Sequence, residues 1–263
     1  MRWILAVFVY FLTLATCPCP PVLFAENEWG DLSIRFVYDG DPPKPERVAV
    51  AGAAGCAAPI VQDSLVVDPN DKGVANVFVW LFRKAGSPVP AVHPDFGKSA
   101  TDEVTMTNAK CQFVPHAAIL RASQTLVQAN TDADGHNMKM DPFNNVPTNV
   151  IIPANGQVKR TFTAAESTPF KVECGIHPWM NGWLLVRDDP YASISDKSGK
   201  LTIKNLPAGE WTFIAWHERA GYISKATLGG KEVAWSRGRF NYTVKPGNND
   251  LGEAKLQPET FSR

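Results

Sequence analysis

The feature that most restricts the fold of this chain is a short segment near its middle, Cys174-Gly175-Ile176-His177-Pro178-Trp179-Met180. It places a thiol, an imidazole and a thioether close together in the spacing Cys-x2-His-x2-Met. Strand-like segments at 169–173 and 182–186 flank it, so the three side chains are expected in a tight loop between two strands. Three donors do not complete a metal site by themselves. The fold must therefore bring a further ligand to this loop from a distant part of the chain.

The donors of this loop suit copper. One thiolate, two imidazoles and a weak axial thioether form the type 1 (blue) site, which accommodates both Cu(I) and Cu(II). Cys174, His177 and Met180 supply three of these donors, with Met180 as the axial one. The best candidate for the second imidazole is His136. Asn137, which follows it, can hydrogen-bond across to the loop and tie the two ligand segments together.

Other side chains could compete for these roles. Met138 and Met140 lie close to His136 in the sequence and could offer a thioether, but Met180 has the better spacing. We therefore expect them to pack at the rim of the site, in a segment, 138–150, that reads as irregular because it is rich in Asn and Pro.

The remaining histidines have less distinctive surroundings. We expect His116 to be an ordinary strand residue. His217 is expected to be a polar residue at a strand end, with the alternative that it contacts the copper region or orients a partner. The chain has five histidines in all, too few for the trinuclear centre of a multicopper oxidase, and it lacks a Cys-x2-Cys-His haem attachment motif. The sequence therefore predicts a protein that is not an enzyme.

The first 25 residues have the pattern of a secretory signal peptide. Arg2 is followed by an apolar run at 3–15, and Ala25 supplies a small residue at the exit. The alternative, a membrane anchor, needs about 20 apolar residues, and prolines interrupt this run. Cys17 lies in a loosely lipoprotein-like context, so lipid attachment there stays open. We expect a periplasmic or extracellular protein without a membrane span in the mature chain.

Export makes the cysteine count informative. Removal of Cys17 and Cys19 with the leader leaves Cys56, Cys111 and Cys174, an odd number in an oxidising compartment. If Cys174 is a copper thiolate, Cys56 and Cys111 are left to form a disulfide, and we favour this pairing. The alternative is a disulfide between Cys174 and one of the other two.

The rest of the chain predicts an all-β fold. Short alternating or apolar runs are separated by turns rich in the 21 prolines and 19 glycines. The run 74–82 is apolar enough to be buried on both faces. No amphipathic helix of more than a couple of turns is expected after the leader. Acidic and basic residues balance at 26 each, so no nucleic-acid partner is expected.

Residues from about 101 to 187 resemble a cupredoxin, the fold of plastocyanin, azurin and amicyanin. The matching segments are Phe113-Val114-Pro115, Ala122-Ser123-Gln124-Thr125-Leu126, Asn130-x-Asp132-x3-His136-Asn137 and the Cys174–Met180 loop. The loop is most similar to that of amicyanin. The resemblance implies one copper ion on His136, Cys174, His177 and Met180. It also implies an apolar patch around the second histidine, including Pro178 and Trp179, where redox partners dock.

The flanks resemble the two parts of a carboxypeptidase-regulatory-like (transthyretin-like) β-sandwich, on segments 32–39, 74–82 and 196–212. The predicted organisation is a signal peptide (1–25), a cupredoxin Greek-key β-sandwich (100–187) and a second, discontinuous β-sandwich (26–99 and 188–263).

Two functions from different classes follow from these features. The first is an exported type 1 copper protein that carries single electrons between redox partners, such as a c-type cytochrome or a membrane oxidoreductase. The alternative is a non-catalytic β-sandwich module, structural or binding, that handles copper or carbohydrate and has a degenerate site.

Overall fold

A computed structural model describes residues 28–48, 56, 60–84 and 86–262, and the predicted signal peptide lies outside them. The all-β class is confirmed. The helical segments of the described residues are short 3-10 turns, at Pro94–Gly97, Ser236–Gly238 and Pro258–Phe261. Within the described residues, no helix is long and apolar enough to cross a bilayer.

Two sheets form the first sandwich. Sheet I has the order β15 (Lys200–Pro207), β1 (Trp29–Tyr38), β21 (Gly247–Leu256), β18 (Lys225–Leu228) and β19 (Lys231–Ala234). Sheet II has the order β14 (Ala192–Ile194), β4 (Phe78–Leu81), β16 (Gly209–His217) and β17 (Gly221–Tyr222), with β20 (Arg239–Val244) also paired to β16. Period-two alternation directs Leu32, Ile34 and Phe36 of β1 into one core with Val79 and Leu81 of β4.

The second sandwich contains the predicted copper region. Sheet III has the order β10 (Thr148–Ile152), β9 (His136–Met140), β12 (Phe170–Glu173), β13 (Asn181–Arg187) and β7 (Ala117–Arg121). Sheet IV has the order β11 (Gln157–Thr161), β8 (Thr125–Asn130), β5 (Glu103–Ala109) and β6 (Gln112–Val114). Met106 and Leu126 of sheet IV pack in one core with Met138, Val172 and Leu184 of sheet III.

The segment 138–150 is more regular than its composition suggests. It contains the end of β9 and the start of β10, which pair as an antiparallel hairpin from His136 opposite Ile152 to Met140 opposite Thr148. The expectation of an irregular segment is therefore wrong at both ends. Pairing with a neighbouring strand overrides the unfavourable local composition.

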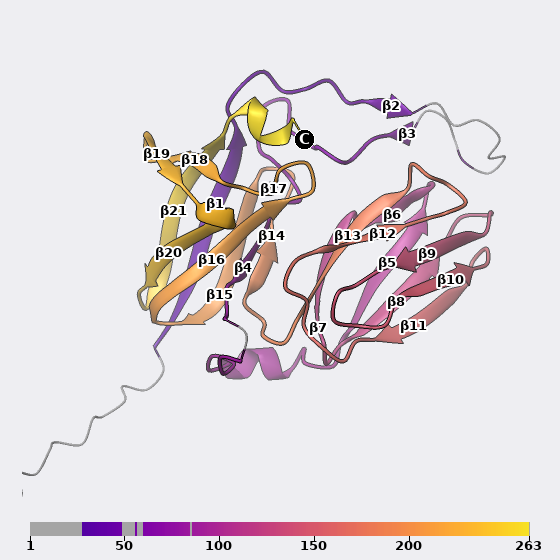
Figure 1. Ribbon diagram of the computed structural model, residues 1–263, viewed down its shortest axis with the longest axis horizontal. Coiled ribbons are helices and arrows are strands. Elements are labelled where there is room, and N and C mark those ends of the chain that lie inside the picture. The colour runs from indigo at the N-terminus through magenta and orange to yellow at the C-terminus, as the bar shows by residue number, and fades with distance from the viewer. Residues whose placement is uncertain (1–27, 49–55, 57–59, 85, 263) are drawn as a thin grey trace, which may run out of the picture.

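The two sandwiches stack through a third core, so the sheets form four layers in the order I, II, III, IV. The outward side chains of β4, Phe78 and Trp80, pack with Trp216 against Ala117 and Leu185 of sheet III. Figure 1 shows β4, β14 and β16 facing β7 and β13 across this contact. All four residues of β4 are buried, which confirms that the run around it is buried on both faces.

A hairpin before β4 reaches across to the second sandwich. It consists of β2 (Arg47–Val48) and β3 (Ile60–Val61), and it lies above sheets III and IV in Figure 1. Ile60 and Cys56 belong to the core of the second sandwich, and the expected disulfide between Cys56 and Cys111 is present. Part of the segment 26–99 thus packs on the second sandwich instead of on the first. The domain limits at 99/100 and 187/188 remain a prediction.

Candidate metal centre

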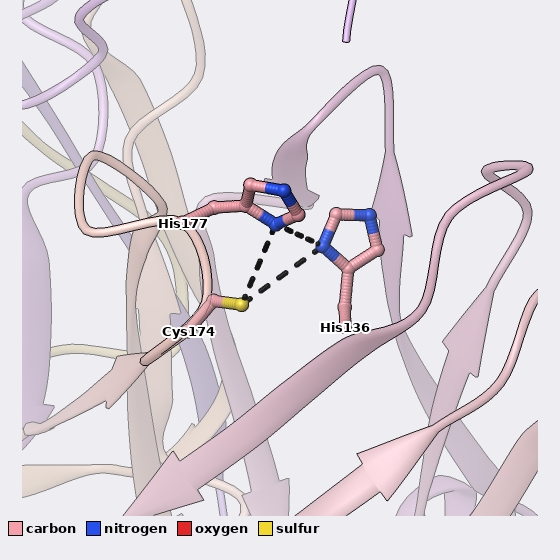
Figure 2. A group of neighbouring side chains, drawn as sticks. All are labelled: His136, Cys174 and His177. Atoms are coloured by element: carbon pink, nitrogen blue, oxygen red, sulfur yellow. Dashed lines mark hydrogen bonds between the residues drawn. The ribbon is translucent and has the colours of Figure 1, made fainter. Parts of the chain in front are cut away.

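Three of the predicted ligands converge at one end of the second sandwich. The Nδ1 atoms of His136 and His177 lie 3.9 and 3.8 Å from Sγ of Cys174, and 2.9 Å from each other. Figure 2 shows the two ring nitrogens and the sulfur facing one another. All three side chains are buried. The fold therefore brings together donor atoms that are separated along the chain.

Neighbouring strands produce this convergence. His136 is the first residue of β9 and Cys174 directly follows β12, and these strands are antiparallel neighbours in sheet III. The start of β9 and the end of β12 therefore lie at the same end of sheet III. The loop after Cys174 is closed by hydrogen bonds from Met180 N to His177 O (2.9 Å) and from Cys174 N to Met180 O (3.2 Å). This closure turns His177 back towards the sulfur.

The donor separations suit a single metal ion. Typical metal–nitrogen and metal–sulfur bonds to such donors are about 2.0 and about 2.3 Å. One ion can reach two nitrogens only if they are less than about 4.0 Å apart, and a nitrogen and a sulfur only if they are less than about 4.3 Å apart. The observed 2.9, 3.8 and 3.9 Å fall within these limits. One thiolate and two imidazoles are also the equatorial donors that a type 1 copper ion takes.

Met180 is fully buried in the same core as Cys174. Its backbone completes the loop closure, which holds the residue at the base of the loop. Its role as the axial thioether stays a prediction. Met138 and Met140 are also fully buried in this core.

Asn137 joins the two ligand segments. Its Oδ1 accepts hydrogen bonds from the backbone N–H of Gly175 (2.8 Å) and Ile176 (3.3 Å) and lies 3.4 Å from Cys174 Sγ. Its Nδ2 donates to Asn149 Oδ1 at 2.6 Å, which orients the amide. These are the contacts expected of Asn137, and its role beside a metal ion remains a prediction.

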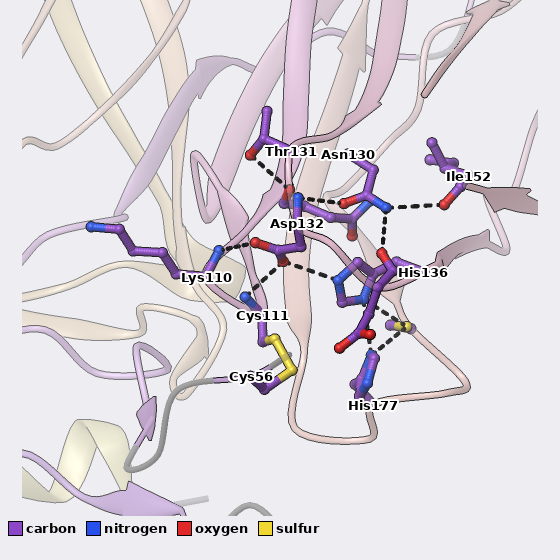
Figure 3. Close-up of polar contacts among 12 residues, drawn as sticks. Cys56, Lys110, Cys111, Asn130, Thr131, Asp132, His136, Ile152 and His177 are labelled. Carbon is purple, nitrogen blue, oxygen red and sulfur yellow. Dashed lines mark hydrogen bonds and ion pairs between the residues drawn. A yellow bond between two sulfur atoms is a disulfide. The ribbon is translucent and has the colours of Figure 1, made fainter. Parts of the chain in front are cut away.

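Asp132 belongs to one of the segments matched by the sequence analysis, which gave it no role in the site. Its Oδ2 lies 3.0 Å from His136 Nε2, the ring nitrogen that faces away from Cys174. The same carboxylate accepts hydrogen bonds from the backbone N–H of Lys110 (2.6 Å) and Cys111 (2.9 Å), as Figure 3 shows. Histidine ligands of metals commonly donate their second N–H to such a carboxylate. The position of Asp132, four residues before the candidate ligand His136, was the sequence signal that could have indicated this contact.

The electrostatics favour the metal-binding forms of two of the donors. Burial would raise the pKa of the Cys174 thiol, but the contact with His136 and hydrogen bonds from nearby backbone amides outweigh it and lower that pKa. Burial lowers the pKa of His177, and the charge of His136 acts in the same direction. Thiolate and neutral imidazole are the forms that bind metals. Burial would also lower the pKa of His136, yet its contacts with Cys174 and Asp132 raise that pKa.

The expected docking residues differ in exposure. Pro178 is exposed, whereas Trp179 is half-buried and donates its indole N–H to the backbone oxygen of Cys111 at 3.2 Å. The His177 ring is 6% exposed, so little of its edge reaches the surface. Ile176, at 54%, is the most exposed large apolar side chain of the loop. A docking role for Pro178 and Trp179 stays a prediction.

His116 and His217 lie at the junction between the sandwiches, outside the donor group. His116 precedes β7 and is not a strand residue, contrary to expectation. Its Nε2 contacts the carboxylate of Glu218, and its Nδ1 lies 3.1 Å from Asp63 Oδ2. His217 is buried, and its Nδ1 accepts a hydrogen bond from Arg219 N at 3.2 Å.

Comparisons with known proteins give matches to solved structures alone. No family model and no curated protein matches the chain. A reduced variant of amicyanin is 19% identical, with a TM-score of 0.29, over 32% of this chain and 82% of that chain. A purple cupredoxin from Nitrosopumilus maritimus is 18% identical, with a TM-score of 0.27, over 31% and 97%. A copper-containing nitrite reductase from Thermus scotoductus is 17% identical, with a TM-score of 0.30, over 40% and 25%. These structural neighbours are cupredoxins or copper proteins, and the case for a metal in this chain comes from its own donor atoms.

Proposed function

We propose that this protein is an exported type 1 copper protein that carries single electrons between redox partners. The observation that supports this most directly is the convergence of His136 Nδ1, His177 Nδ1 and Cys174 Sγ within 3.9 Å of one another. Copper, when bound to such donors, supplies a one-electron couple whose two states accept similar geometry.

The protein contributes a rigid donor set. His136 belongs to β9, and the Cys174 end of β12 is held by pairing to both β9 and β13. Asn137 fixes the backbone between Cys174 and His177 through the N–H groups of Gly175 and Ile176. Because the donors are buried and held by strands and hydrogen bonds, a change in metal charge needs little movement of the protein. Small movement is what rapid electron exchange requires.

We further propose that the protein is a carrier and not an enzyme. The chain has five histidines, and two are assigned to this centre. The other three all lie in the described part of the chain and are engaged elsewhere. His116 contacts Asp63 and Glu218, His217 contacts Arg219, and His93 accepts a hydrogen bond from Asp95 N. No histidine is left over for a second copper cluster that could reduce dioxygen.

A route for electrons is proposed at the loop itself. The exposed Ile176 and Pro178 flank His177 in sequence, so a partner seated on them would approach the ring closely. Suitable partners are a c-type cytochrome or a membrane oxidoreductase on the same side of the membrane.

Visible absorption of the Cu(II)-loaded protein tests the proposal. We expect an intense thiolate-to-copper band at about 600 nm, lost in Cys174→Ser and His177→Asn and retained in the control His93→Asn. Cyclic voltammetry should then show a reversible one-electron couple. A colourless protein would favour the alternative of a structural or binding module with a degenerate site, and a band without reversible electron exchange would contradict the carrier role.

A further inference from the structure

The tight turn between β5 and β6 has an unusual backbone. Its two residues, Lys110 and Cys111, both have positive φ, 53° and 55°, although neither is glycine. Such a pair matches the two-residue type I′ turn that joins antiparallel strands. Non-glycine residues adopt this region only where surrounding contacts hold them there. Here the contacts include the disulfide from Cys111 to Cys56 and the carboxylate of Asp132.

Asp132 connects this turn to one ligand. Its two oxygens accept the N–H groups of Lys110 and Cys111, and Oδ2 also faces His136 Nε2 at 3.0 Å. An ionised carboxylate can only accept hydrogen bonds, so His136 must carry its proton on Nε2 to donate. That tautomer leaves the lone pair on Nδ1, the atom that faces Cys174 and His177. Asp132 thereby sets both the ring orientation and the tautomer of His136.

The same turn also holds the other ligand segment. The backbone oxygen of Cys111 accepts the indole N–H of Trp179, which lies between His177 and Met180 in the loop. The Trp179 and His177 rings are 5.1 Å apart between centroids. Cys111 is fully buried. The N–H of Cys111 is therefore linked to His136 through Asp132, and its C=O is linked to the Cys174–Met180 loop through Trp179.

We propose that the disulfide-bonded Lys110–Cys111 turn is the support that positions the metal centre, with Asp132 as the positioning residue for His136 and Trp179 as the tie to the loop. This inference rests on the proposed metal-binding function. It also assigns a role to the segment before β4, because Cys56 comes from the hairpin that crosses from the first sandwich. Loss of the disulfide, far from any donor in sequence, should weaken metal binding.

The first test uses the metal-free protein. Nitrogen-15 NMR of the histidine rings, recorded at a pH high enough for His136 to be neutral, should show His136 as the Nε2–H tautomer in the wild type. Asp132→Ala removes the oxygen that faces His136 Nε2, so the tautomer preference should be lost. Asp134→Ala removes a carboxylate two residues away and should leave the tautomer unchanged. An Nε2–H preference that survives in Asp132→Ala would overturn the role of Asp132.

The second test measures Zn(II) affinity, because zinc takes the same thiolate and imidazole donors. We expect a loss of about 10- to 100-fold, the usual cost of removing an outer hydrogen bond, in Asp132→Ala and in Cys56→Ser/Cys111→Ser. The combined triple variant should lose little more, because both changes disable one support. Unchanged affinity in a folded double-serine variant would overturn the role of the disulfide.

Trp179→Phe keeps an aromatic side chain but removes the indole N–H, so it tests the turn even if the double-serine variant does not fold. We expect weaker Zn(II) binding with an unchanged His136 tautomer, and unchanged affinity would overturn the tie to the loop. The two proposals can fail separately. If the tautomer and the zinc affinity respond as expected but copper gives no blue band, the electron-carrier proposal fails while the support role stands.

Discussion

Two pairs of buried histidines lie in this molecule, and they are used in opposite ways. In the candidate metal centre, His136 and His177 direct their Nδ1 atoms at each other and at a thiol. At the junction of the sandwiches, His116 lies between two carboxylates, while the neighbouring His217 accepts a backbone hydrogen bond and packs edge-on against Phe261.

The difference lies in which ring nitrogens are free. Both nitrogens of His116 face acidic groups, so it has no lone pair to offer a metal. Its contact with Asp63 is close but outside hydrogen-bond alignment, so we regard it as electrostatic. Burial would lower the pKa of His116, but Asp63 and Glu218 outweigh it and raise this pKa to about 9. His116 is therefore a charged residue that links the segments of Asp63 and Glu218 by ionic contacts. Burial of a histidine alone does not indicate a ligand; the identity of its partners does.

The largest effect is expected when a candidate ligand histidine and the salt-bridged His116 are replaced in turn and the copper affinities are compared. His136→Asn removes a donor, so Cu(II) binding should fall by more than the roughly 10- to 100-fold that losing an outer hydrogen bond costs. His116→Asn should leave copper affinity within a few-fold of the wild type if the protein is folded. Competition titration against a chelator measures both. Equal losses in the two variants would remove the distinction between the pairs.

A smaller effect concerns stability against pH, in the metal-free protein. Since the folded pKa of His116 is about 9, against 6.5 for the ordinary imidazole, its stabilising effect is complete below about pH 6.5 and is lost as the pH rises through about 9. Burial lowers the pKa of His217 to about 3. The unfolded chain therefore binds a proton at this residue more readily than the folded protein does, and the free energy of unfolding decreases as the pH falls from about 6.5 towards 3.

Urea denaturation across this pH range checks both slopes. His116→Gln should flatten the alkaline side, where the wild type loses on the order of a few kcal/mol, and His217→Gln should flatten the acidic side. His93→Gln serves as the control. Persistence of the alkaline slope in His116→Gln would show that another group titrates there.

The smallest effect is expected at Asn137. Asn137→Ala removes the acceptor for two loop amides, which should cost about 1 kcal/mol of unfolding free energy and speed hydrogen exchange at Gly175. Asn149→Ala removes only the acceptor of the hydrogen bond donated by Asn137 Nδ2 and should leave the Gly175 amide protected. Amide exchange by NMR separates the two variants, and equal exchange rates would mean that Asn137 does not hold the loop.

Local pattern was enough to predict the centre's three converging donors. The Cys174–Met180 loop carries its donors in one tight spacing between strands, and His136-Asn137 could be recognised as a candidate by residue type. The odd cysteine count pointed to the Cys56–Cys111 disulfide, which is present. Alternation and turn residues were enough for the all-β class, because strand periodicity and turn chemistry are local properties.

The tertiary structure decided the distant contacts that have no local signature in the sequence. His116 and Glu218 are 102 residues apart, and no spacing rule connects them. The link from Asp132 to the Cys111 turn depends on β5 and β8 being parallel neighbours, so that the segments that follow them lie together. The continuous apolar run at 74–82 predicts that both faces of β4 are covered, but not that one face meets sheet III. Side-chain periodicity determines which face is buried, whereas the order of the sheets depends on packing between surfaces that are far apart in the chain.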